Sequence, residues 1–200
     1  MSEKFASAEL TAGQLNALVK KLGGHEKALQ FLRGELAVTP AETPKLLEFL
    51  TSVSVPAVKR FVASDHFKHG ETVHGVKCYF WDNFRKHFEN KVEDGVEACD
   101  IRIHKLLRSS RDLGIRAELT KEREETKLAH LFHLLTLQPN GEKGVLLTNG
   151  WANICYIRDT EGTLWAVSAY WFAAYLVWFL HADSVERPLE WSDGYFVCSR

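Results

Sequence analysis

The sequence lacks the features by which several common classes of protein are recognised. Its four cysteines are widely spaced and form no CxxC pair, which argues against a zinc ribbon or a thioredoxin-type redox centre. The opening stretch MSEKFASAEL lacks the apolar core of a signal peptide. Lys and Arg total 25 against 26 Asp and Glu, so no bulk charge points to nucleic acid or an anionic membrane. We therefore expect a cytoplasmic protein with free thiols.

Familiar catalytic motifs are missing as well. The chain contains no GxSxG, HExxH, Walker A or GxGxxG pattern, and it has no internal repeat or low-complexity tract. It does have 200 residues that are 46% hydrophobic, with twelve Phe and six Trp, and this is ample for a real core. The composition thus indicates a folded domain and leaves its chemistry open.

The N-terminal quarter carries helical periodicity. Behind an N-cap at Thr11, four apolar residues recur at helical spacing: Leu15, Leu18, Val19 and Leu22. Gly23 and Gly24 then precede a second predicted helix over residues 25–33. A third is predicted to begin at Thr43 and Pro44 and to run to about Val53. The pattern predicts a three-helix module over residues 1–54.

The remaining residues, 55–200, mix both periodicities. Residues 76–80 and 101–107 are strand-like, and Thr120 is a predicted cap for a helix that continues to Leu135. Alternation and turn composition then predict strands near 152–158, 164–171, 175–182 and 194–199. We therefore predict an α+β fold, in which a mixed region and a C-terminal antiparallel β-meander follow the helical module.

Residues 163–182, TLWAVSAYWFAAYLVWFLHA, contain no Asp, Glu, Lys or Arg. A helix of this length would span roughly 30 Å of hydrocarbon, at a rise of about 1.5 Å per residue. However, Tyr170, Trp171 and Tyr175 would then lie at its middle, whereas membrane helices place such residues at their interfaces. A hairpin that bends near residues 172–174 is favoured over a membrane segment, and a buried helix is the third interpretation.

Five stretches, near the two ends of the sequence, resemble a known group of proteins. NGWANICYIRDTEGTLWAV, SVERPLEW and FVCSR near the C-terminus resemble the signature of an uncharacterised family of small bacterial proteins from reduced-genome candidate-phylum lineages. LTAGQLNALVKKLGG and FLRGEL resemble the amino end of the same family. The family has no established activity, so the resemblance implies no catalytic residue.

The segment KKLGGHEKALQFLRGE resembles the central part of a repressor-type helix-turn-helix, whose second helix enters the major groove. The residues directed to DNA or its phosphates would be Lys20, Lys21, His25, Lys27, Gln30 and Arg33. Its turn is about one residue short of that pattern, and Glu26 would face phosphates. The alternative is a small helical module used for packing or protein contact.

Residues 65–78 hold the side chains that could form a metal site, His66, His69, His74 and Cys78. Their spacing matches no standard zinc motif, so solvated loop histidines are the preferred interpretation. His130 and His133 lie one helical turn apart and are expected to border the core. We therefore predict no metal and no cofactor.

A helix followed by antiparallel strands is also the outline of small ribonucleases, which need an acid–base pair and a cation. Arg158, His181 and Glu186 are the candidates for these roles, with Asp183 orienting the imidazole. An outline alone does not establish chemistry, and charged strand ends are the ordinary explanation.

Taken together, the residues favour a non-enzymatic binding or regulatory protein that acts through its helical module or its aromatic-rich sheet. Its expected partner is another protein or a second copy of the chain, and a membrane partner is disfavoured. A DNA-binding regulator and a small ribonuclease-like enzyme are retained as alternatives.

Overall fold

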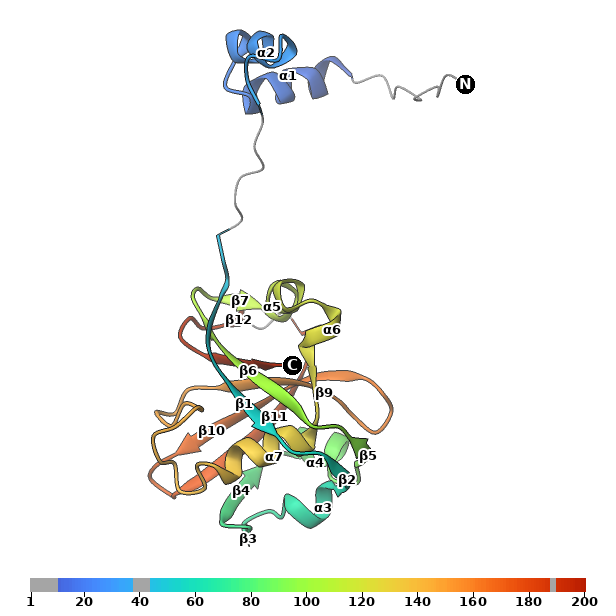
Figure 1. Ribbon diagram of the computed structural model, residues 1–200, viewed down its shortest axis with the longest axis vertical. Helices are drawn as coiled ribbons and strands as arrows, with labels where there is room; N and C mark the ends of the chain where they lie inside the picture. Colours follow the sequence, from blue (N-terminus) through green and yellow to red (C-terminus); the bar gives the residue numbers. More distant parts are fainter. Residues whose placement is uncertain (1–10, 38–43, 188–189) are drawn as a thin grey trace. The chain divides into compact units, whose positions relative to one another are not determined.

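The computed structural model describes residues 11–37, 44–187 and 190–200. The chain divides into two compact units, Met1–Pro44 and Lys45–Arg200 (Figure 1). Each unit has its own architecture.

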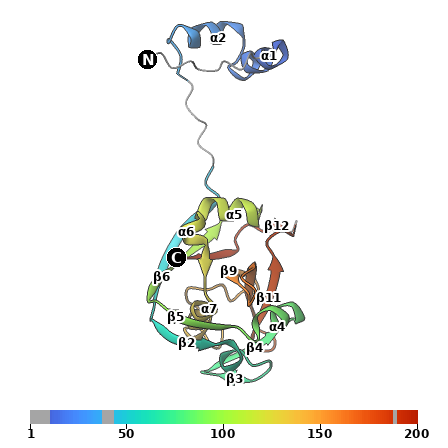
Figure 2. The ribbon, with the colours of Figure 1, turned by 90° about the vertical axis from the view of Figure 1, so that its right-hand side faces the viewer.

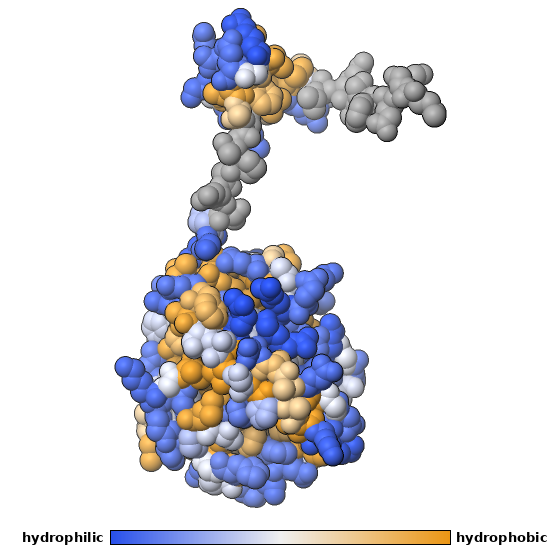
Figure 3. Space-filling model, in the orientation of Figure 1, coloured by the Kyte–Doolittle hydropathy of each residue, from blue (hydrophilic) through white to orange (hydrophobic). Residues whose placement is uncertain are grey.

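Within the first unit, the described residues form two helices, α1 (Ala12–Lys21) and α2 (His25–Leu32). Thr11 and Gln14 form a capping box at the start of α1, as the N-cap prediction at Thr11 expected. Gly23 and Gly24 adopt positive φ between the helices, a conformation that costs glycine little. Figure 3 shows hydrophobic residues gathered on one side of this unit. Of the described residues in α1 and α2, only Ala28 is buried.

The predicted third helix is wrong. Residues Leu47–Val55 form strand β1, which pairs antiparallel with β6 (Cys99–Leu106). Both carboxylate oxygens of Glu118 accept the backbone N–H groups of Leu46 and Leu47, at 2.8 and 2.9 Å. These long-range partners override the local helical spacing, so the three-helix module is not formed. Thr43, the predicted cap, lies outside the described residues.

The second unit is built on a nine-stranded sheet. Its strands lie in the order β1, β6, β13 (Phe196–Ser199), β9 (Asn153–Arg158), β10 (Leu164–Phe172), β11 (Val177–Ser184), β4 (Val76–Phe80) and β3 (Thr72–Val73), with β8 (Glu125–Thr126) added beside β9. The pairs β13–β9, β11–β4 and β8–β9 are parallel.

The sheet is therefore mixed, and the predicted C-terminal antiparallel meander is wrong. The last strand, β13, inserts between β6 and β9, and β4 adds beyond β11. Residues 163–182 do form the antiparallel hairpin β10–β11, with Phe172 opposite Val177. Among the described residues, no helix is long and apolar enough to cross a membrane. The α+β class itself agrees with the structure.

Among the described residues of this unit, five helices and two small sheets complete the fold. The helices are α3 (Ala63–His66), α4 (Asp82–Phe88), α5 (Asp112–Leu119), α6 (Lys121–Glu124) and α7 (Leu128–Thr136). The small sheets pair β2 (Val58–Val62) with β5 (Val92–Val96), and β7 (Ser110–Arg111) with β12 (Glu190–Trp191). Helices α5 and α6 lie near β7 and β12 at one end of the unit, and α3, β2 and β3 lie at the other (Figure 2).

The helix predicted from Thr120 onward is broken in the structure. Thr120 adopts a φ of 66°, and β8 separates the short α6 from α7. Glu93 in β5 accepts the backbone N–H groups of Leu128 and Ala129, each at 3.0 Å, and so satisfies the start of α7. The sequence could not reveal this cap, because its carboxylate comes from a distant strand.

Side chains of the sheet alternate between two hydrophobic clusters. Val167 and Ala169 of β10 pack into the larger cluster with α4 and α7, whereas Ala166 packs into the smaller cluster with α5. Since successive residues of a strand point to opposite faces, the clusters lie on opposite sides of the sheet. The smaller cluster covers only part of its face, and a groove lies over β10, β11 and the end of β4.

Candidate functional site

The groove has a volume of about 600 Å³, and we call it the aromatic groove. It is lined by Trp81, Gly150, Tyr170, Trp171, Phe172, Phe179, His181, Asp183, Arg187, Glu190, Trp191 and Tyr195. Apart from Trp171, which also packs in the larger cluster, the lining residues of these strands follow period-two alternation, with even residues from β10 and odd residues from β11. Tyr170, for example, lies directly opposite Phe179.

Four rings form a continuous row beside the groove. The ring centroids of Tyr175 and Phe172 are 5.2 Å apart, those of Phe172 and Phe179 are 5.7 Å apart, and those of Phe179 and Tyr79 are 5.6 Å apart. Phe172 is 45% exposed and Tyr175 is 69% exposed. The row thus crosses from the β10–β11 turn to β4 and leaves aromatic surface in contact with solvent, as binding surfaces do.

The polar part of the groove is formed around Asp183. His181 Nδ1 lies 2.8 Å from Asp183 Oδ2, and Arg187 Nη1 lies 3.0 Å from Asp183 Oδ1. The Asp183 side chain is 7% exposed. Burial acts to raise the pKa of Asp183, but the hydrogen bonds from His181 and Arg187 outweigh it and lower that pKa. Asp183 is therefore a carboxylate with both oxygens engaged.

Asn83 in α4 holds the other side of the imidazole. Its Nδ2 lies 3.0 Å from His181 Nε2 and also donates to the carbonyl of Ala182. In the neutral ring whose Nδ1–H donates to Asp183, Nε2 accepts from Asn83. The edge of the Trp81 ring packs against it with a centroid distance of 5.2 Å. Both ring nitrogens of His181 are thus occupied.

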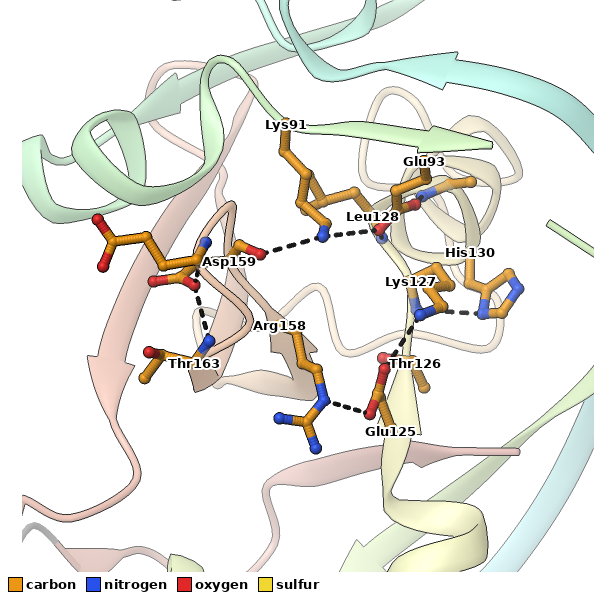
Figure 4. A network of polar contacts seen from close by, with 12 residues as sticks. Lys91, Glu93, Glu125, Thr126, Lys127, Leu128, His130, Arg158, Asp159 and Thr163 are labelled. Atoms are coloured by element: carbon orange, nitrogen blue, oxygen red, sulfur yellow. Dashed lines mark hydrogen bonds and ion pairs between the residues drawn. The ribbon is translucent and has the colours of Figure 1, made fainter. Parts of the chain in front are cut away.

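The three residues predicted as an acid–base set are separated. His181 lines the groove beside Asp183, as the predicted orienting contact requires. Arg158 instead donates to Glu125 at 2.8 Å (Figure 4). It also donates to the carbonyl of Gly162 at 2.8 Å. Glu186 is exposed, and neither Arg158 nor Glu186 lines the groove.

The histidines considered for metal binding make other contacts. His66 Nδ1 is 2.9 Å from the carbonyl of Val62, and its ring stacks on Phe61. His69 Nδ1 accepts the backbone N–H of Phe80 at 3.3 Å. Burial raises the pKa of the Cys78 thiol to about 12, which disfavours the thiolate that zinc requires.

His74 adopts a φ of 48° in the turn before β4, and its ring lies 5.9 Å from that of His66. His133 is half-buried in α7, whereas His130 is buried. The described part of the chain contains no group of three His, Cys, Asp or Glu side chains that could hold a metal ion.

A second cleft, of about 420 Å³, is lined mainly by charged residues. Lys91 lies 3.8 Å from Glu93, and Lys127 lies 3.0 Å from Glu125, so these cations have acidic partners nearby (Figure 4). Cys99 Sγ is 3.6 Å from His130 Nε2, which suggests a thiol–imidazole pair. However, His130 Nδ1 accepts the backbone N–H of Lys127, so in the neutral ring Nε2 carries the proton and cannot take one from the thiol.

The residues considered for DNA contact lie on α1, on α2 and just after α2. Lys20 and Lys21 form the last turn of α1, His25 begins α2, and Arg33 follows its end. All six are exposed except Gln30, which is half-buried. The connection between the helices spans residues 22–24.

Sequence reasoning did not identify the groove residues Trp81, Tyr170 and Tyr195 or Asn83, which contacts His181. The usable signal was the concentration of aromatic residues along β10 and β11, which already indicated an aromatic-rich sheet. The parallel pairing of β4 with β11, which brings Trp81 and α4 to the site, joins segments about a hundred positions apart and has no local signature.

No family model, no curated protein and no solved structure matches the chain. The resemblance to the uncharacterised bacterial family thus stays a prediction.

Proposed function

We propose that the protein is a non-enzymatic binding protein and that the aromatic groove takes its ligand. The observation that carries this proposal is a concave site with aromatic walls and one pre-arranged polar end. Ligand sites typically have volumes of roughly 300–1,000 Å³, apolar walls and a few placed polar groups. The groove, at about 600 Å³ with His181, Asp183 and Arg187 at its polar end, fits this description.

The same geometry favours binding over catalysis. Asn83 occupies His181 Nε2, the nitrogen that a general base would use. None of the described residues that line the groove is Ser, Thr, Cys or Lys, the usual nucleophiles. A His–Asp pair with both ring nitrogens engaged is suited to orienting a surface and not to transferring a proton.

The aromatic walls supply the attraction. Phe179 lies at the centre of the four-ring row, between Phe172 and Tyr79, and it is only half-buried. A ligand that covers this ring gains from apolar burial and from ring–ring contact, together about 1–2 kcal/mol. Loss of the ring is therefore expected to weaken binding about tenfold.

A neutral fluorescent probe, N-phenyl-1-naphthylamine, tests the proposal directly. We expect saturable binding to the parent protein with one site per chain, and about tenfold weaker binding to Phe179→Ser. Phe49→Ser is the matched control, because Phe49 is an exposed aromatic on the edge strand β1 and does not line the groove. Equal probe affinity in both variants, or no saturable binding to the parent, would overturn the proposal.

A further inference from the structure

We infer that the groove selects a positively charged ligand, an organic cation with an ammonium or guanidinium group. This inference rests on the proposed function and names the chemistry of its ligand.

The first observation is the balance of charges that line the groove. Asp183 and Glu190 contribute two carboxylates, and Arg187 contributes one guanidinium, which leaves one excess negative charge. His181 adds none when its ring is neutral, with Nδ1–H donated to Asp183 and Nε2 accepting from Asn83. Charge complementarity therefore favours a cation and disfavours a phosphate or carboxylate.

The second observation is the large area of aromatic ring surface. The faces of aromatic rings carry negative quadrupolar potential and attract cations placed within about 6 Å of the ring centroid. The row already shows one such contact, because Lys77 Nζ lies 5.8 Å from the centroid of Tyr79. A ligand cation in the groove would face the rings of Tyr170, Phe179 and Trp81, which line it.

The third observation is that Arg187 already places a cation on Asp183. Its side chain is 57% exposed whereas that of Asp183 is 7% exposed, so the guanidinium reaches the buried carboxylate from the solvent side. A ligand cation that replaced the guanidinium would keep the carboxylate paired with a positive charge. This predicts that removal of the Arg187 charge strengthens the binding of a cation, whereas it would weaken the binding of an anion.

The test compares three ligands that share one aromatic ring: benzyltrimethylammonium, benzyl alcohol and benzenesulfonate. Binding is followed by tryptophan fluorescence and by nuclear magnetic resonance of the intact chain. We expect benzyltrimethylammonium to bind at least fivefold more tightly than benzyl alcohol, and benzenesulfonate to bind most weakly. Nα-acetyl-arginine amide, as a second cation, tells whether a guanidinium fits better than a quaternary ammonium.

Charge variants give the decisive comparison. We expect Glu190→Gln to weaken benzyltrimethylammonium binding about threefold or more, and Arg187→Gln to strengthen it by a similar factor. Glu161→Gln, an exposed glutamate in the β9–β10 turn, is the control and leaves the affinity unchanged. Neither groove variant should change the affinity for the neutral probe.

Two failures are distinguishable. Suppose that the neutral probe binds, that benzenesulfonate binds more tightly than benzyltrimethylammonium, and that Arg187→Gln weakens benzenesulfonate binding. The inference of a cation is then wrong, and the proposed function stands. If the neutral probe itself fails to bind the parent, the proposed function falls.

Discussion

His181 donates its Nδ1–H to Asp183 Oδ2 at 2.8 Å, and the two side chains lie two residues apart on one face of β11. Period-two alternation alone brings such a pair together, because residues i and i+2 of a strand share a face. The bond selects the tautomer of the imidazole and keeps the Asp183 carboxylate ionised. The polar end of the aromatic groove therefore exists before any ligand arrives, which lowers the cost of binding.

Asp183→Asn is expected to lower the free energy of unfolding by about 1–3 kcal/mol at pH 7, because two hydrogen bonds to a buried charge are weakened. The pKa of Asp183 is lowered in the folded state, so its contribution is present above the unfolded pKa of about 3.9 and is lost as the pH falls through the lower folded value. Urea unfolding at pH 7 and pH 3 measures the change, and the difference between parent and variant should shrink at pH 3.

The matched control for this variant is Asp94→Asn, which breaks the exposed ion pair between Asp94 and Arg60. Such pairs contribute roughly 0–1 kcal/mol. Equal destabilisation by the two variants would contradict the role given to Asp183.

His130 is expected to make the protein sensitive to mild acid. Burial, together with the positive charges of Arg200 and Lys127, lowers the pKa of His130 to about 4. The unfolded chain binds this proton near pH 6.5, whereas the folded chain binds it only near pH 4. The free energy of unfolding therefore has its full value above pH 6.5 and decreases as the pH falls toward 4. The loss amounts to about 2–3 kcal/mol.

His130→Asn keeps an acceptor near the position of Nδ1 and cannot bind the proton. We expect the variant to show a flatter decline of unfolding free energy between pH 7 and pH 4, measured by urea unfolding. His25→Asn, at the exposed start of α2, should show the same decline of unfolding free energy between pH 7 and pH 4 as the parent protein. A titration of the His130 resonances with a midpoint near 6.5 in the folded protein would show the prediction to be wrong.

The parts of the fold that the sequence predicted are those with local causes. Thr11 was predicted as an N-cap, and Gln14, which completes its capping box, is only three residues away. The β10–β11 hairpin follows from ordinary strand lengths after the preceding turn and from positions of Trp and Tyr that do not suit a membrane helix.

The errors arise where distant partners decide the structure. Leu46 and Leu47 have helical spacing with their neighbours, but Glu118 and strand β6 hold them in an extended chain. The insertion of β13 between β6 and β9 likewise depends on pairings between distant segments. The His181–Asp183 pair could be predicted because it is local, whereas Asn83 could not, because a parallel strand pair brings it to the site.

We expect Glu93 to stabilise the N-terminus of α7 strongly. Its two carboxylate oxygens accept two helix N–H groups that have no partner within the helix, and its side chain is buried. Glu93→Gln replaces one acceptor by a donor that faces a second donor, so we expect a loss of about 1–3 kcal/mol in the free energy of unfolding. Hydrogen exchange at Leu128 and Ala129 should accelerate in this variant.

Glu97→Gln is the control for Glu93, because Glu97 lines the same cleft but is exposed. Unchanged exchange at Leu128 and Ala129 in Glu93→Gln would refute the capping role.

Lys27 and Arg33 provide the test of the DNA-binding alternative. Of the described residues in α1 and α2 only Ala28 is buried, and Glu26 lies among the cations, so these helices give a recognition helix little support. We therefore expect the double variant Lys27→Gln, Arg33→Gln to be retained on duplex DNA like the parent at every salt concentration. The matched control is Lys59→Gln, Arg60→Gln, which removes the same charges from exposed positions of β2. If instead the slope of log affinity against log salt falls by about 2 in the first variant alone, two phosphate contacts have been lost and the helices bind DNA.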